Sequence, residues 1–277
     1  MYARVGEIRA FVPSGTPMLA VTATVTKSLR IDVCRKLEMS ACKFVFASPE
    51  RSNIFYEVLC RTEIEVDIKH MVDDLRINKN MTSRVIIYCR SYNLCSDLYA
   101  FFLTSLGEDH SYFPPGAPKI SDNRLFGMYH ANTPTHNKEV ILSSMQKADG
   151  VVRVVFATVA LGMGVNFIGL NKVVHYGALA SIDDYFQESG RAGRSGEAAK
   201  STIYWKPGDA PLKKDLSNPK NAELRSVRQY LQNNKECRRR QLLDYFERDL
   251  FSSVLCQDKL LCCDVCANSV IKFCLVL

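Results

Sequence analysis

Short apolar runs alternate with longer amphipathic segments over the central part of this chain. The apolar runs predict strands, and segments whose apolar residues recur every three or four positions predict helices. The predicted strands are residues 84–88, 125–129, 151–157, 172–175 and 201–204, and the predicted helices between them are residues 71–80, 91–106, 135–147 and 182–190. The strand at 151–157 is apolar on both faces, as is typical of a central parallel strand. This order predicts an α/β fold built on a doubly wound parallel sheet.

The patterns on either side of this central part are weaker. The elements predicted there are short strands at residues 18–21 and 43–46, a helix at about 26–37, an extended segment at 56–69, a surface loop at 107–123, and helices at 222–231 and 237–251. Within the extended segment, Ile64, Val66 and Ile68 alternate with charged neighbours. We therefore expect three parts: residues 1–60, 61–208 and 209–277.

Composition and charge narrow the class of protein. Hydrophobic residues make up 47% of the chain and charged residues 23%, which is ordinary for a globular protein. The sequence has neither an apolar run of about eighteen residues nor a secretory signal, so no membrane span or secretion is predicted. Six of the seven net positive charges fall in residues 191–277, which hold 16 Lys+Arg and 10 Asp+Glu. This basic portion predicts a polyanionic partner, most commonly nucleic acid.

The eleven cysteines fall into two groups. In a chain without a secretion signal they predict a reducing compartment, where thiols stay free or bind metal. Five lie scattered in apolar segments and are predicted to be small core residues: Cys34, Cys42, Cys60, Cys89 and Cys95. The other six lie within residues 237–274, and the two-residue gap between Cys263 and Cys266 suits two thiolates on one tetrahedral Zn²⁺ ion. A group of unligated buried cysteines is the alternative.

Residues 187–194 (QESGRAGR) combine arginines, a glutamine and two glycines. We predict a helix that places Gln187, Arg191 and Arg194 on one face, because they are three and four positions apart. Gly190 and Gly193 would let another surface approach the backbone closely. Guanidinium groups are preferred ligands for a phosphate whose charge grows during transfer. The segment is therefore predicted to contact a phosphate, and a solvated helix with a charge cluster is the alternative.

Three further polar motifs follow predicted strands, and parallel sheets bind ligands at the carboxyl ends of their strands. Arg90 and Ser91 follow the first central strand and begin a helix, whose free amides form an anion site. His130 follows the second strand, and Thr158, a potential donor to phosphate, follows the third. The glycines after Thr158 that permit tight backbone geometry are Gly162 and Gly164.

In this order, the motifs resemble those of one enzyme family. Residues 16–266 resemble the C-terminal part of a RecQ-family DNA helicase, and the matching segments are residues 21–24 at the end of the first RecA-like lobe and residues 85–91, 129–131, 156–166 and 187–194 in the second lobe. The resemblance implies a RecA-like second lobe followed by a small α-helical zinc-binding subdomain. It also implies 3′-to-5′ DNA unwinding driven by ATP with Mg²⁺. The implied setting is the nucleus (or cytoplasm), in DNA replication, recombination and repair, with single-stranded DNA and duplex junctions as partners.

The resemblance also assigns roles to individual residues. Gln187, Arg191 and Arg194 would act in catalysis by facing the γ-phosphate of ATP. The residues implied in cofactor binding are Gly162, Gly164, Asn166 and Gly190, of which Asn166 would help link the nucleotide site to the DNA site. The residues implied in nucleic-acid contacts are Arg90, Ser91, His130, Thr158, Arg238 and Arg239.

The cysteine-rich C-terminal part strengthens the resemblance, because DEAD-box RNA helicases share the general lobe plan and lack the zinc subdomain. The implied zinc ligands are Cys237, Cys256, Cys263 and Cys266. Six residues separate Cys256 from Cys263, where the family usually has two, so Cys262 is a competing ligand. Cys274 is not expected to bind the metal.

Two motifs that such an ATPase needs are absent from the sequence. No glycine is followed by lysine, as a Gly-x-x-x-x-Gly-Lys-Ser/Thr phosphate loop requires, and no Asp-Glu pair is present to hold Mg²⁺. We expect a fragment, truncated gene model or short isoform that is inactive alone, with the nucleotide held by a missing N-terminal lobe or a partner. We also expect residues 1–60 to be loosely packed, with apolar strand edges exposed.

Three alternative functions stay open. The first is a non-catalytic nucleic-acid-binding or regulatory module derived from a helicase, which the absent phosphate loop favours. The second is an RNA helicase from another branch of superfamily 2, which the zinc cluster disfavours. The third is a zinc-finger regulator attached to an α/β domain, which leaves the ordered motif series unexplained.

Overall fold

A computed structural model of the protein describes residues 2–13, 15–22, 25–39, 41–46, 50–158, 161, 165–209, 219–251 and 258–274. At its centre is a six-stranded sheet in which neighbouring strands are all parallel. The strands are β1 (Ile54–Cys60), β2 (Arg84–Cys89), β3 (Phe126–Tyr129), β4 (Val154–Ala157), β5 (Leu170–Tyr176) and β6 (Ala199–Trp205), in the spatial order β1-β6-β5-β2-β4-β3. The predicted parallel sheet is confirmed.

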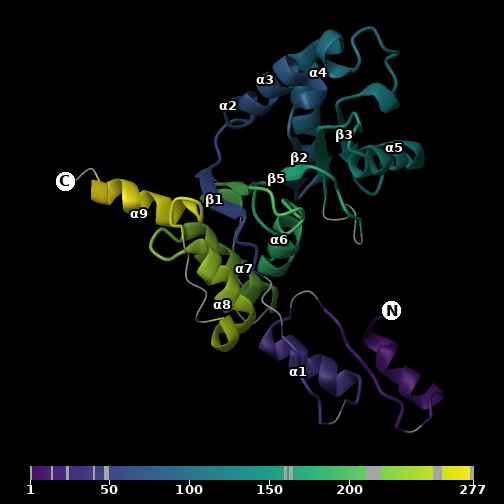
Figure 1. Ribbon diagram of the computed structural model, residues 1–277, viewed down its shortest axis with the longest axis vertical. Helices are drawn as coiled ribbons and strands as arrows, with labels where there is room; N and C mark the ends of the chain where they lie inside the picture. The colour runs from purple at the N-terminus through teal and green to yellow at the C-terminus, as the bar shows by residue number, and fades with distance from the viewer. Residues whose placement is uncertain are drawn as a thin grey trace.

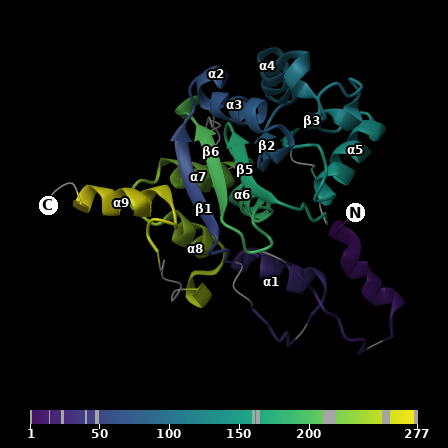
Figure 2. The same cartoon turned by 45° about the horizontal axis from the view of Figure 1, so that its top comes forward.

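Helices cover both faces of this sheet, so the sheet is doubly wound (Figures 1 and 2). The helices are η1 (Tyr2–Phe11), α1 (Lys27–Lys36), α2 (Ile64–Asp67), α3 (Lys69–Asn78), η2 (Lys79–Met81), α4 (Tyr92–Ser111), η3 (Ser121–Asn123), α5 (Thr135–Gln146), α6 (Ile182–Ser189), η4 (Pro207–Asp209), α7 (Pro219–Gln232), α8 (Arg238–Phe251) and α9 (Asp264–Cys274). One face packs on α3 and α4, and the other packs on α5 to α8. None of the helices in the described ranges is long and apolar enough to cross a membrane.

The sheet begins earlier in the chain than the sequence pattern predicts. β1 pairs with β6 over its whole length and forms an outer strand of the sheet, although the sequence-based division places it in the N-terminal part. The extended segment predicted at 56–69 is wrong beyond Cys60, because α2 follows within a few residues. Ile68 is fully buried while Val66 is 70% exposed, so these side chains do not share one face as they would in a strand.

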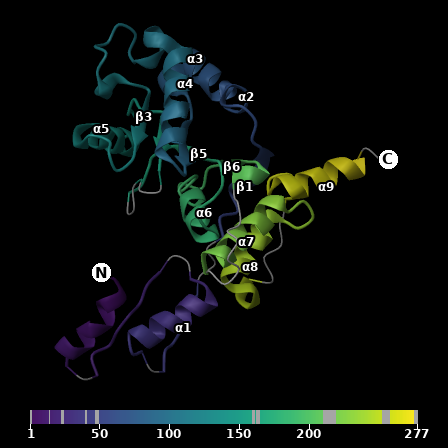
Figure 3. The ribbon, with the colours of Figure 1, turned by 180° about the vertical axis from the view of Figure 1, so that it is seen from behind.

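The N-terminal segment, residues 2–46, contains η1 and α1 and lies apart from the sheet (Figures 1 and 3). The strands predicted at 18–21 and 43–46 are wrong, because both stretches have irregular backbone. A strand is stabilised by pairing with neighbours, and neither stretch reaches the sheet. Several apolar side chains of this segment are nevertheless exposed: Phe11 is 85% exposed, Leu19 86% and Val45 97%.

The C-terminal part packs directly on the sheet. Tyr230 of α7 and Leu242 of α8 are buried in the same core as Tyr56 of β1. The turn before α9 covers the outer edge of β1, where Tyr56 N donates to Cys262 O at 3.3 Å and Val58 N donates to an Asp264 carboxylate oxygen at 3.1 Å. Open strand edges invite pairing with other chains, and this edge is closed by the protein itself.

Candidate functional site

Four residues predicted to contact nucleic acid lie at the carboxyl edge of the sheet. Arg90 and Ser91 follow β2, His130 follows β3 and Thr158 follows β4, and these three strands are neighbours. Arg90 and Ser91 are exposed, while His130 and Thr158 are half-buried. The ring of His130 lies edge-on to the ring of Tyr92, with 5.1 Å between centroids. The structure therefore brings these four residues together on an accessible edge.

Two local contacts hold this edge in place. Ser91 caps α4, since its hydroxyl accepts a hydrogen bond from Leu94 N at 3.2 Å. The guanidinium of Arg90 donates to Leu179 O at 3.4 Å. A guanidinium carries five N–H donors, so Arg90 can hold this contact and a phosphate together.

The residues predicted to contact a phosphate lie at the opposite, amino edge. α6 ends at Ser189 and Gly190 is its C-cap, so the helix predicted through Arg194 is wrong. Glycine is a poor helix former, which explains the early end. Gln187 is exposed on α6, whereas half-buried Arg191 and exposed Arg194 lie in the turn that leads to β6. We call residues 190–197 the arginine turn.

Two side chains from the segment before β1 hold the arginine turn. Arg51 donates to the carbonyl oxygens of Gly190 at 3.2 Å, Ala192 at 3.2 Å and Gly193 at 2.6 Å. Asn53 Nδ2 donates to Gly193 O at 2.8 Å and to Glu197 O at 2.6 Å. Sequence reasoning misses both residues, because they belong to no motif and their partners lie about 140 positions away.

Gly193 must be glycine for two reasons. Its φ of +59° lies in the left-handed region that favours glycine. A Cβ atom there would also lie 2.4 Å from Asn53 Nδ2 and 2.7 Å from Glu197 O, both far too close. The predicted close approach to the backbone is thus made by Asn53 of the chain itself.

The arginine turn concentrates positive charge. Burial, followed by the charges of Arg191 and Arg51, lowers the pKa of Arg194 below its ordinary value. Arg194 donates to two neutral acceptors, Val165 O at 3.2 Å and Asn166 Oδ1 at 3.4 Å. An anion between these guanidinium groups would relieve their repulsion, and phosphate accepts paired hydrogen bonds from arginine. This edge is therefore chemically suited to a phosphate.

The segment between β4 and β5 connects the two edges. The chain leaves β4 at Thr158 and enters β5 at the opposite edge, a distance of roughly 20 Å for a seven-residue strand. Leu161 and Phe167 anchor the described parts of this segment in the core. Near its end Asn166 contacts the arginine turn. The predicted cofactor-binding glycines Gly162 and Gly164 lie outside the described residues.

A buried pair fixes α6 to the sheet beneath the arginine turn. His175 Nε2 on β5 lies 2.8 Å from a carboxylate oxygen of Glu188 on α6. The His175 ring stacks on the Tyr88 ring of β2, with 5.2 Å between centroids. Burial raises the pKa of Tyr88, and the charge of Arg191 opposes this shift. Arg191 therefore lies close to Tyr88, the second-to-last residue of β2.

Four cysteine thiols converge beside β1. The sulfur atoms of Cys237, Cys262, Cys263 and Cys266 all lie within 4.8 Å of one another. Zn–S bonds of about 2.3 Å in a tetrahedral site separate the sulfurs by about 3.8 Å, so this cluster fits one zinc ion. The competing ligand Cys262 completes the set, and Cys256 lies outside the described residues. Hydrogen bonds from Cys237 and Cys262 lower the pKa of Cys263, and hydrogen bonds to Cys262 and Cys263 raise the pKa of Cys237.

Arg238 and Arg239 do not lie on a nucleic-acid interface in this structure. They are 4% and 6% exposed, respectively. Arg238 Nε donates to an Asp264 carboxylate oxygen at 2.5 Å, and Arg239 donates to backbone carbonyl oxygens of residues 51, 52 and 54. The predicted contact with DNA is wrong for both, because their donors are committed to fixing α8 against β1. The next residue, Arg240, has a side chain that is 53% exposed.

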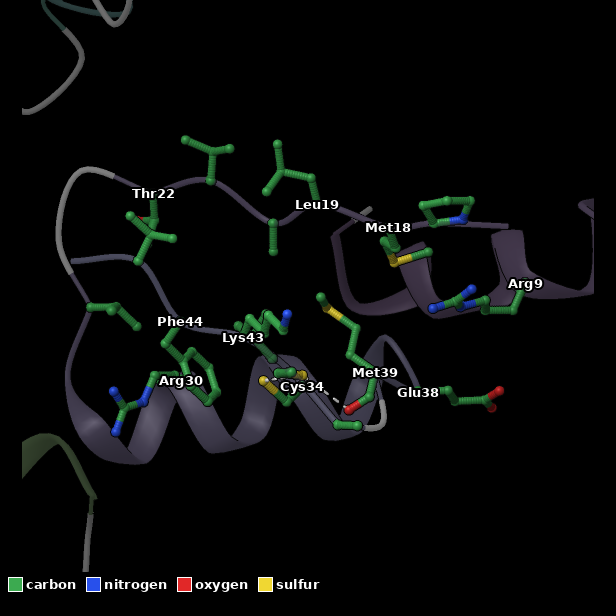
Figure 4. A pocket seen from close by; sticks show the side chains of 18 of the residues that line it. Arg9, Met18, Leu19, Thr22, Arg30, Cys34, Glu38, Met39, Lys43 and Phe44 are labelled. Carbon is green, nitrogen blue, oxygen red and sulfur yellow. Dashed lines mark hydrogen bonds between the residues drawn. The ribbon is translucent and has the colours of Figure 1, made fainter. Parts of the chain in front are cut away.

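The N-terminal segment encloses a separate cavity of about 1250 Å³ (Figure 4). Its lining includes Leu19, Arg30 and Phe44, and the sulfur atoms of Cys34 and Cys42 lie 3.6 Å apart beneath it. A smaller cavity of about 260 Å³ adjoins His130 at the carboxyl edge. The arginine turn lines neither of these two cavities.

Comparisons with known proteins agree with this layout. The family model for the helicase conserved C-terminal domain matches residues 67–196, and the RecQ zinc-binding model matches residues 209–267. The chain is 28% identical over 264 residues to the ATP-dependent DNA helicase hus2/rqh1 of Schizosaccharomyces pombe, covering 92% of this chain and 18% of that protein. It is 31% identical over 266 residues to the ATP-dependent helicase SGS1 of Saccharomyces cerevisiae, covering 91% of this chain and 16% of that protein.

The chain thus spans less than a fifth of the length of these two relatives. Among solved structures, S. cerevisiae Dbp5 bound to RNA and ADP BeF3 has a TM-score of 0.53, with 15% identity, and the match covers 83% of this chain and 53% of that one. At such low identity the likeness concerns the fold alone.

Proposed function

We propose that this chain, which belongs to the RecQ helicase family, supplies the second half of an ATP-driven DNA motor. Arg191 and Arg194 contact the γ-phosphate and stabilise the charge that develops during hydrolysis, with Gln187 beside them. Gly190 shapes the turn that carries the two arginines. The nucleotide and Mg²⁺ are held by another part of the protein or by a partner, because residues 1–277 contain no glycine followed by lysine.

One observation carries this proposal: three arginines meet at the arginine turn. Arg51 donates to three carbonyl oxygens of the turn, and Arg194 reaches Val165 O and Asn166. Burial, followed by the charges of Arg191 and Arg51, lowers the pKa of Arg194. Like charges are held together in this way when a ligand of opposite charge offsets them. Arg51 is committed to three carbonyl oxygens of the turn. Arg191 and Arg194 follow in the same turn, and we assign the phosphate contact to them.

The carboxyl edge holds the DNA strand in the same proposal. Arg90 and Ser91 bind backbone phosphates, and His130 and Thr158 lie along the same path. The segment from Thr158 to Asn166 carries movement from the nucleotide edge to the DNA edge, because Thr158 follows β4 at the carboxyl edge and Asn166 contacts the arginine turn. Travel in the 3′-to-5′ direction rests on the family resemblance.

Zinc has a structural role in the proposal. Cys237, Cys262, Cys263 and Cys266 would hold the ion, which would crosslink the start of α8 to the turn before α9. Both elements contact β1, so the metal stabilises the outer strand of the sheet.

The decisive experiment replaces the matching segment of the S. pombe relative with this chain, so that a complete helicase presents the nucleotide. In this chimera, Arg191→Ala and Arg194→Ala are each expected to lower ATP turnover by about 10³- to 10⁵-fold without changing DNA affinity at fixed salt. Arg76→Ala, on the opposite face of the sheet, is the matched control and should leave turnover unchanged. DNA-stimulated turnover by the chain alone, abolished by Arg191→Ala, would overturn the expected inactivity of the isolated chain.

Two observations support alternative functions, which can be tested in the same way. The absent phosphate loop favours a binding module without catalysis, which would show salt-dependent DNA affinity and an inactive chimera. A protein of Acanthamoeba polyphaga mimivirus, named as an ATP-dependent RNA helicase, is 28% identical over 96% of this chain and 44% of its own length. Binding to single-stranded DNA and RNA of one sequence, measured side by side, separates a DNA motor from an RNA motor.

A further inference from the structure

A continuous series of contacts runs from the cysteine cluster to the arginine turn. We propose that Arg51 and Asn53 are positioning residues for Arg191 and Arg194, and that Arg239 connects them to the cysteine cluster. The catalytic consequence rests on the proposed function. The mechanical connection stands on the contacts alone.

The first step leads from the cysteines to the segment before β1. Arg239 lies two positions after Cys237, and its guanidinium lies beside the Cys262 thiol. Its Nη1 donates to Arg51 O at 3.1 Å, while its Nη2 donates to Ser52 O at 3.2 Å and to Ile54 O at 2.9 Å. One buried side chain therefore holds three backbone carbonyl groups of residues 51–54 beside the cysteine cluster.

The second step leads from that segment to the arginine turn. Arg51 and Asn53 belong to the stretch of backbone that Arg239 holds. Their side chains together donate five hydrogen bonds to carbonyl oxygens of the turn. Hydrogen bonds from a charged donor are roughly twice as strong as neutral ones. The backbone of Asn53 also accepts from Ala199 N at 2.9 Å, which ties the same residue to β6.

The turn also has backbone supports and one buried anchor. Gly193 N donates to Leu170 O at 2.8 Å, Ala192 N donates to Ser189 O at 3.1 Å, and the Ala192 side chain is fully buried. Beyond Gly193 the residues of the turn are exposed, and an exposed turn opens readily unless side chains hold its backbone. A displacement of about 1 Å at a catalytic group can lower a rate by about 100-fold. The hydrogen bonds from Arg51 and Asn53, which we call the clamp, therefore matter for Arg191 and Arg194 if these contact a phosphate.

Amide hydrogen exchange on the full chain tests the connection without any nucleotide. Arg51→Ala and Arg239→Ala are expected to speed exchange of the amides of residues 191–197 by about tenfold, while the amides of β4 stay protected. Arg240→Ala is the matched control for Arg239→Ala, because this neighbour on α8 has an exposed side chain that pairs with Asp244 at 3.9 Å. Arg61→Ala, which removes the partner of Asp209 at the far end of β1, is the control for Arg51→Ala.

Removal of zinc from the full chain by a chelator should speed exchange in α8 and in the arginine turn together. Faster exchange in α8 with an unchanged arginine turn would overturn the connection. Faster exchange throughout the sheet would overturn it too, because the change would then be general unfolding. The conservative variant Arg51→Lys should show an intermediate effect. Its ammonium group keeps the charge but lacks the planar guanidinium that reaches three carbonyl oxygens at once.

Kinetics in the S. pombe chimera separate positioning from folding. Arg51→Ala should lower kcat for ATP by about 100-fold with KM for ATP and DNA affinity unchanged. An equal loss in every parameter would contradict a positioning role. If Arg191→Ala leaves turnover intact, the proposed function fails, while the exchange result still decides whether Arg51 holds the turn.

Discussion

The two edges of the sheet are built in opposite ways. At the amino edge, the arginine turn is held by side chains that arrive from distant parts of the chain, among them Arg51 and Asn53. At the carboxyl edge, exposed Ser91 is held within its own helix by Leu94 N, and exposed Arg90 makes one long contact, to Leu179 O after β5. A phosphate undergoing transfer demands exact placement of its ligands, whereas a DNA backbone passing over a surface demands charge along a path.

This contrast predicts how each edge responds to substitution. Small geometric changes at the amino edge should have large effects that salt does not alter. Removal of one charge at the carboxyl edge should have a modest effect that depends on salt.

Gly193→Ala is expected to have the largest effect, because the new methyl group would collide with Asn53 and with Glu197 O. In the chimera we expect ATP turnover to fall by about 100-fold or more. Gly196→Ala is the matched control, since its φ of +90° brings strain of roughly 1–2 kcal/mol but no atom lies within 4 Å of the added carbon. Equal losses from the two variants would show that backbone strain, and not the clamp, governs the turn.

Cys262→Ser should weaken zinc binding by more than about 100-fold, since loss of an outer-shell partner alone weakens metal binding by about 10- to 100-fold. Competition with a chromogenic chelator, together with metal analysis of the purified chain, measures this. Cys256→Ser should leave zinc content unchanged. The reverse result would assign the fourth ligand to Cys256 and remove Cys262 from the site.

Arg90→Ala should lower affinity for single-stranded DNA by about tenfold and reduce the slope of log K against log salt by about 0.7. Fluorescence anisotropy over a salt series measures both quantities, with Arg76→Ala as the control. A loss of affinity that is independent of salt would mean that Arg90 supports the fold and does not contact a phosphate.

Asn166→Ala should have the smallest effect. It removes one long, exposed hydrogen bond that Arg194 donates, worth about 0.5–1 kcal/mol, so DNA stimulation of turnover in the chimera should fall by about two- to fivefold. DNA affinity should stay unchanged, because the lost contact is at the amino edge. Unchanged stimulation would indicate that the two edges communicate by another route.

The central sheet could be predicted from sequence because its strands are continuous apolar runs. β2 and β4 are buried over their whole length, and such runs leave little choice of structure. The prediction fails where a short pattern fits two structures. The alternation at Ile64, Val66 and Ile68 has the period of a strand, yet the chain forms a helical turn there because Ile68 packs against α3 and α4.

The candidate site was predictable only as far as it consists of local motifs. The sequence identifies Arg191 and Arg194, but not the end of α6 at Ser189 or the clamp by Arg51 and Asn53, which depends on partners far along the chain. It also misplaces Arg238 and Arg239. Charged side chains at a helix start are usually solvated, and only the tertiary structure brings carbonyl oxygens and Asp264 to them.

The turn before α9, which covers the outer edge of β1, has a practical consequence for the design of shorter versions of this protein. A cut between the helicase-like lobe and the cysteine-rich part, near residue 209, falls where family boundaries suggest two separable pieces. Such a cut would strip the partners from Tyr56 N and Val58 N and leave a bare parallel strand in solvent. The trimmed lobe would then tend to stack with copies of itself, so the smallest piece worth purifying extends through Cys266.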